Sequence, residues 1–295
     1  MFKDYFSIKR PNLNIDLSPV RVFISNYRNL VGVCCFSLVF LIGFFMFGHA
    51  GLYFNLSGFL IVVGGTCAVA FISFKFERLK ILYLVLKRSY RSREIAPEEI
   101  VETLVDLSLK SKLRGLLSLQ EDEQEATVMF LRHALGYLVD GYDTRQIRDF
   151  LTTETRFFQM RREETERVLR TLAEICPSFG LIGSVVGLMS MLAGVGDSSV
   201  ILATIPVALT STLYGVLFAN FLFLPLAAHI QERTDREVLL QHIITEGVIA
   251  IAGNLHPRAL ENKLKSFLTP SARADKLVSL ERIQQKFNVR PAAKK

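Results

Sequence analysis

The chain has 295 residues, of which 50% are hydrophobic and 21% are charged, and its formal net charge is +7. The apolar residues gather in two regions, 30–74 and 176–229, that contain no Lys or Arg, so the chain is predicted to cross a membrane. All 35 Lys and Arg residues lie in the three blocks between and beside these regions, which membrane topology explains better than binding to nucleic acid.

Residues 1–29 are predicted to form a cytoplasmic N-terminal tail, and residues 30–74 a transmembrane hairpin. Residues 30–47 and 56–74 would be its two spans, because about 20 apolar residues cross the hydrocarbon core as a helix. The first apolar run begins too late to be a signal peptide and has no small-residue cleavage site before the second span. The cysteines have no metal-ligand spacing and are interpreted as small packing residues.

Residues 75–172 are predicted to form a cytoplasmic helical domain. Pro97 with two acids after it marks the start of one helix, which Gly115 should end. A second helix is expected to begin near Glu121 and to run through Leu138. Asp143 is a candidate cap for a third helix, which has no Gly or Pro before Pro177 and should therefore continue directly into the membrane.

Residues 173–230 are predicted to form the second transmembrane hairpin, with a turn near Asp197. Its last span is expected to continue as a helix to Gly253, so that two long helices project side by side into the cytoplasm. Cytoplasmic helices are assigned to residues 231–269, the last of them short, and a mobile C-terminal tail to 270–295. Lys and Arg in all three polar blocks place both termini in the cytoplasm. The fold class is thus all-α, with four transmembrane helices.

Hydroxyl side chains are the chemical feature of the second hairpin, and Thr210, Ser211 and Thr212 are consecutive. A single Ser or Thr in a membrane helix commonly bonds to its own backbone, but three in a row cannot all face lipid at low cost. The spans contain no carboxylate at membrane depth, although a chain that moved ions alone would need one. If ions cross here, another subunit must supply the titratable group.

Several ordered motifs resemble the MotA/PomA stator subunits of the bacterial flagellar motor. In the membrane these are CPSFGLIGSVVGLMSML (176–192), ALTSTLYGVLFAN (208–220) and LPLA (224–227). Cytoplasmic matches are GLLSL (115–119), VDGYD (139–143) with IRDF (147–150), and TEGV (245–248) with ENKL (261–264). The resemblance covers roughly residues 30–270.

This resemblance implies a division of labour in the bacterial inner membrane. Five copies would surround two copies of a single-span MotB or PomB partner, whose membrane Asp carries the ion. Ser184 and Thr212 match positions that line the ion path. Pro177 and Pro225 match prolines that couple ion passage to movement of the cytoplasmic domain, in keeping with the ability of proline to bend a helix.

The resemblance also implies a charged contact with the rotor protein FliG. Lys112 and Arg114 match the basic side of that contact. Gln120 stands where the family has an acid, so either Glu121 takes its place or the contact has changed. The plainer alternative is that these residues form a solvated face.

Three functions stay open at this stage. The favoured one is an ion-conducting stator for motility and chemotaxis, which uses protons or sodium, needs no cofactor and is not an enzyme. The second is a TolQ- or ExbB-like energiser of an outer-membrane process, although those proteins typically have three spans. The third is a membrane scaffold that conducts nothing, against which the hydroxyl cluster argues.

Overall fold

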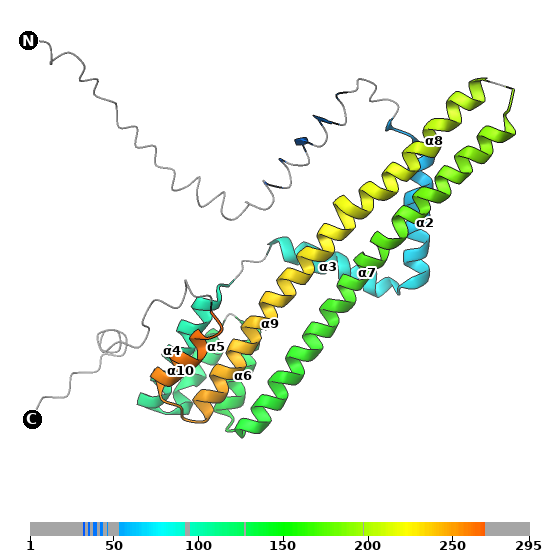
Figure 1. The fold of residues 1–295 in the computed structure, drawn as a ribbon. Coiled ribbons are helices and arrows are strands. Elements are labelled where there is room, and N and C mark those ends of the chain that lie inside the picture. Colours follow the sequence, from blue (N-terminus) through cyan, green and yellow to red (C-terminus); the bar gives the residue numbers. More distant parts are fainter. Residues whose placement is uncertain are drawn as a thin grey trace, which may run out of the picture. The chain divides into compact units, whose positions relative to one another are not determined.

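The computed structural model describes residues 53–91, 95–126, 128–196 and 198–268, together with isolated positions between 32 and 46. All regular elements in these ranges are helices, as predicted (Figure 1). The chain divides into two units, Met1–Asn55 and Leu56–Lys295, and the helices discussed below belong to the second. The two predicted tails, Asp197 and most of the predicted first span lie outside the described residues.

Three helices in the described ranges are long and apolar enough to cross a membrane. They are α2 (Leu56–Ser73), α7 (Thr144–Ala193), and the continuous helix Ser198–Ala252, which consists of α8 (Ser198–Leu217), the π-helical segment η3 (Phe218–Phe223) and α9 (Leu224–Ala252). At 1.5 Å per residue a 50-residue helix such as α7 is about 75 Å long, against about 30 Å for the hydrocarbon core. Four spans in total remains a prediction.

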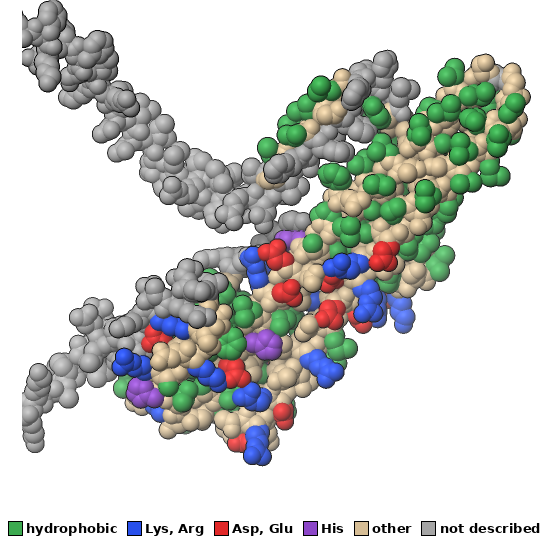
Figure 2. Space-filling view, viewed as in Figure 1, with side chains coloured by type: hydrophobic (Ala, Val, Ile, Leu, Met, Phe, Trp, Pro, Cys, Tyr) green, Lys and Arg blue, Asp and Glu red, His purple; other side chains and the backbone are tan. Residues whose placement is uncertain are grey.

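The two long helices therefore extend well beyond the membrane, as the sequence predicted. Figure 2 shows hydrophobic side chains over α8 and the end of α7 that lies toward it, whereas charged side chains gather over α9, the other end of α7 and the helical domain. The start of α7 is fixed by Asp143, whose carboxylate accepts from the backbone of Arg145 while Gln146 bonds back to the backbone of Asp143. This reciprocal arrangement is a capping box, and it confirms the predicted helix start.

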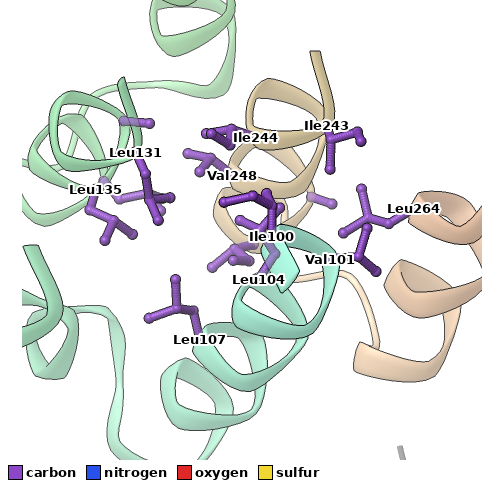
Figure 3. Close-up of a cluster of buried hydrophobic side chains, with 14 of the residues drawn as sticks. Ile100, Val101, Leu104, Leu107, Leu131, Leu135, Ile243, Ile244, Val248 and Leu264 are labelled. Carbon is purple, nitrogen blue, oxygen red and sulfur yellow. The ribbon is translucent and has the colours of Figure 1, made fainter. Parts of the chain in front are cut away.

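The helical domain beside the far end of α9 consists of α4 (Pro97–Arg114), η2 (Leu116–Leu119), α5 (Gln120–Glu125), α6 (Met129–Val139) and α10 (Pro257–Lys265). Its core joins leucines of α4 and α6 to Ile243, Ile244 and Val248 of α9 and to Leu264 of α10 (Figure 3). Gly115 ends α4 at φ 84°, a backbone conformation that favours glycine.

The prediction of one helix from Glu121 through Leu138 was wrong. The chain becomes extended at Ala126 and Val128, which separates α5 from α6. The acidic segment α5 has no buried residue, whereas α6 buries a full apolar face. A break between them lets α6 turn that face into the core while α5 stays at the surface.

Ion pairs join α7 to α9 along the part that projects from the apolar spans. Arg162 lies 3.3 Å from Glu237, and Arg148 lies 2.8 Å from Glu246, which also pairs with Lys263 of α10. Burial acts to raise the pKa of the Glu246 carboxyl, but hydrogen bonds from Lys263 and Arg148 outweigh it and bring that pKa below its ordinary value. Glu246 thereby holds three helices together.

Candidate functional site

The helices α7 and α8 cross with their backbones almost in contact, and glycine makes this possible. A Cβ atom at Gly180 would lie 2.9 Å from the carbonyl oxygen of Ser211, and one at Gly187 would lie 2.8 Å from the backbone nitrogen of Ala208. Gly183 likewise faces the side chain of Ser211. Small residues in this register allow membrane helices to approach closely.

Four oxygen atoms meet in this crossing. The Ser184 hydroxyl lies 2.7 Å from the carbonyl oxygen of Ala208 and 3.2 Å from that of Gly180, and it also bonds to the Thr212 hydroxyl. Thr212 is in turn 3.5 Å from the carbonyl of Gly180. The two residues that the family resemblance assigned to an ion path are therefore in contact, although they come from different helices.

The other two hydroxyls of the triplet behave differently. Thr210 donates to the carbonyl of Pro206 at 2.6 Å, and Ser211 donates to Val207, so both bond to their own helix. A bond of this kind gives a buried hydroxyl a hydrogen-bond partner within its own helix, so that no second helix is needed. Of the three hydroxyls, that of Thr212 reaches across to α7. Thr212 is half-buried, so the oxygen cluster lies at the edge of the helix pair.

Pro177 lies beside this cluster, inside α7. It has no backbone N–H, so α7 lacks one hydrogen bond at that turn and bends there more easily. A Cβ atom at Gly215 of α8 would lie 3.0 Å from the Cα atom of Pro177. A change in the bend of α7 at Pro177 would therefore press directly on α8.

Pro225 occupies the first turn of α9, directly after the π-helical segment Phe218–Phe223. It is exposed, and it lies on the same continuous helix as Thr212 but several turns away. Wide turns of this kind are uncommon and are frequently found at functional sites. Neither this segment nor Pro206, a further proline inside α8, was anticipated from the sequence. Pro206 could have been found by searching the spans for proline.

The four residues predicted to meet a rotor flank η2 in the helical domain. The Lys112 ammonium donates to the backbone carbonyl of Asn254 at 2.7 Å and also to its side-chain oxygen, so it is bound to the turn that ends α9. Glu121 is 3.6 Å from Lys110, which sequence reasoning did not single out. Arg114 and Gln120 are exposed. Lys112 and Glu121 on this surface thus already have partners within the chain.

Comparison with known proteins identifies the family. The profile of the MotA/TolQ/ExbB proton channel family matches residues 121–242. Motility protein A of Treponema phagedenis is 33% identical over 79% of this chain and 90% of its own length. The uncharacterized protein YtxD of Bacillus subtilis is 36% identical over 73% of this chain and 79% of its own length. The chain belongs to the MotA family.

A solved structure agrees with this MotA assignment. The structure of C. jejuni MotAB superposes with a TM-score of 0.77 at 28% identity. The superposed region covers 87% of this chain and 99% of the C. jejuni chain. A MotA-family protein is a membrane subunit of the flagellar stator and acts as an ion channel. Ser184 and Thr212, which the family resemblance assigned to ion passage, are in contact where α7 and α8 cross, and Pro177, which it assigned to coupling, lies two turns before Ser184 along α7.

Proposed function

We propose that this MotA-family chain conducts ions together with a single-span partner of the MotB or PomB type and converts their flow into torque on the flagellar rotor. The observation that carries the proposal is the oxygen cluster of Ser184 and Thr212. It offers hydroxyl and carbonyl oxygens in the middle of two spans, and the apolar region 176–229 has no charged side chain besides Asp197 at its turn. The partner's membrane Asp supplies the missing titratable group.

The cluster acts by exchanging hydrogen bonds. When a hydrated ion reaches the partner's carboxylate, the Thr212 hydroxyl turns from Ser184 toward the ion or its water. The ion's departure restores the bond between the two hydroxyls. The carbonyl of Gly180 lies within hydrogen-bond distance of both hydroxyls and one turn from Pro177, so this exchange affects the part of α7 that bends most easily. The chain takes part without catalysis and without a bound cofactor.

The coupling ion is proposed to be the proton, in keeping with the proton channel family profile. One observation favours sodium as a second candidate, since the cluster consists of oxygen atoms alone and hard cations take oxygen ligands. A proton-driven motor and a sodium-driven motor should respond differently to a change of the external cation. Replacing Na⁺ by K⁺ leaves proton-driven rotation unchanged and stops sodium-driven rotation.

The assembly follows the family pattern. Five copies surround two partner subunits in the bacterial inner membrane, with both termini of this chain in the cytoplasm. The rotor protein FliG meets the surface formed by Lys112, Arg114, Gln120 and Glu121. Because Lys112 also fixes the end of α9, rotor contact there would be transmitted along α9 toward the spans.

The proposal is tested by replacing Thr212 in cells whose stators contain only this chain and its partner. Thr212→Val keeps the shape but removes the hydroxyl, and we expect it to reduce rotation at least tenfold while membrane abundance is unchanged. Thr212→Ser keeps the hydroxyl and serves as the control, with rotation close to that of the parent. Normal rotation of the Thr212→Val cells would refute the role assigned to the cluster.

A further inference from the structure

We propose that α3 (Phe76–Arg91) lies on the membrane surface and binds anionic phospholipid headgroups through Lys80 and Lys87. The first support is its position in the chain. The candidate span α2 ends at Ser73, and α3 begins at Phe76, three residues further on. Three extended residues reach about 10 Å, so α3 starts at the boundary of the bilayer. Figure 1 shows that α3 turns away from α2 rather than continuing its direction.

The inner face of α3 fixes its orientation. Leu82 is buried among Val168, Leu169 and Leu172 of α7 and Ile230 of α9, and Leu79, Val85 and Leu86 pack around the same cluster. Arg78 adds a pair with Glu164 of α7 at 3.4 Å. α3 is therefore held against both long helices, and its opposite face is turned outward.

That outward face is rich in apolar and aromatic side chains. Phe76 is 66% exposed and Tyr83 is 64% exposed, and Ile81 and Leu84 are exposed as well. Phe76 also stacks on Phe71, near the end of α2, with ring centroids 6.5 Å apart. Aromatic residues next to a span end are typical of the headgroup layer, where one side of the ring meets lipid and the other meets water.

Two exposed lysines lie within this apolar face. Lys80 and Lys87 are seven residues apart, so they lie on the same side of the helix, two turns from each other. Phe76 and Tyr83 flank them on one side and Leu84 flanks them on the other. Neither lysine has a carboxylate partner within 4 Å in the described ranges, whereas Arg78 has one.

This pattern fits a lipid better than a protein partner. Apolar side chains that border lysines can enter the bilayer surface while the ammonium groups reach phosphates at its edge. A bilayer must surround α2, so its headgroup layer is present beside α3 whether or not another protein binds there. Anionic lipids such as phosphatidylglycerol match the positive charge of Lys80 and Lys87.

The absence of tryptophan from the chain allows a local test. Tyr83→Trp places a single fluorophore on the face, and the complex with the partner subunit is reconstituted in phosphatidylcholine containing brominated phosphatidylglycerol or brominated phosphatidylcholine. Bromine quenches only nearby tryptophan, so the quenching gives the relative binding of the two lipids at α3. The complex without the Tyr83→Trp change supplies the background from the partner.

We expect brominated phosphatidylglycerol to quench more strongly than brominated phosphatidylcholine. Lys80→Gln and Lys87→Gln should each lower that preference by about fivefold, and the double variant should abolish it. Arg145→Gln removes one positive charge at the start of α7 and is the matched control, with no effect expected. Equal quenching by both lipids would overturn the headgroup site. Absence of quenching by either lipid would show that another protein or a second copy covers α3.

Discussion

Gly180→Ala probes the helix crossing that holds the oxygen cluster. The added methyl group would lie 2.9 Å from the carbonyl oxygen of Ser211 and 3.1 Å from the Cα atom of Thr212. Both are backbone atoms, so they cannot rotate away as a side chain could. The only relief is for α7 and α8 to move apart.

The required movement can be worked out from these distances. A carbon atom normally approaches a carbonyl oxygen to about 3.3 Å and another carbon to about 3.5–4.0 Å, so the helices must separate by roughly 0.5–1 Å. Overpacking of this kind costs about 1–3 kcal/mol, against a gain of about 1 kcal/mol from replacing glycine by alanine within a helix. The protein should still fold and insert, but the contact between Ser184 and Thr212 would open.

Rotation speed of a bead attached to a flagellum measures the consequence, and an immunoblot of membranes measures abundance. We expect Gly180→Ala to lower the speed at least tenfold at unchanged abundance. Gly64→Ala in α2 is the matched control, because a Cβ there would meet nothing within 4 Å. Parent-like rotation of Gly180→Ala would show that the close crossing is not needed for ion passage.

Two further predictions concern stability. Glu246→Gln should lower the apparent Tm of the purified protein at neutral pH by an amount equivalent to about 1–2 kcal/mol, because Lys263 and Arg148 then no longer have a charged hydrogen-bond acceptor at this position. Because the folded state lowers the pKa of Glu246, the stability that this carboxylate contributes is present above the ordinary carboxyl pKa and is lost as the pH falls through the folded pKa. The Tm values of the parent and of Glu246→Gln should therefore converge in acid. A Tm difference that stays constant with pH would contradict the pairing. Leu104→Ala should cost about 2–5 kcal/mol, because this leucine is fully buried against Gly247, whereas Leu117→Ala at an exposed position should leave Tm nearly unchanged.

Local rules predicted the long helices well. Asp143 is a strong cap, and no Gly or Pro lies between it and Pro177, so the continuous α7 followed from the sequence. Gly115 likewise ended α4 as expected. These features depend on a few neighbouring residues, and such signals are visible without the fold.

The contacts across helices were harder to predict. That Thr212 reaches Ser184 while Thr210 and Ser211 bond to their own helix depends on how α8 is rotated against α7, which the hydroxyl pattern alone does not specify. The hydrogen bond between Lys112 and Asn254 joins residues that are 142 positions apart in the sequence. Asn254 accepts it from a left-handed backbone conformation with φ 56°. Lys112 therefore has a structural partner that no local motif indicated.

The π-helical segment Phe218–Phe223 also had no signal in the sequence. Five of its six residues are apolar, and Asn220 donates to the carbonyl of Val216 on its own helix, so no residue in the segment marks a wide turn. Pro225, whose coupling role stays a prediction, lies two residues after the end of this segment.

The most direct test of the central claim, that this chain supplies half of an ion path and needs a carboxylate from a partner, is flagellar rotation in cells without other stators. Rotation should appear when the chain is expressed with its single-span partner and should be lost when the partner's membrane Asp is changed to Asn. Rotation that survives that change, or that the chain supports without a partner, would contradict the account.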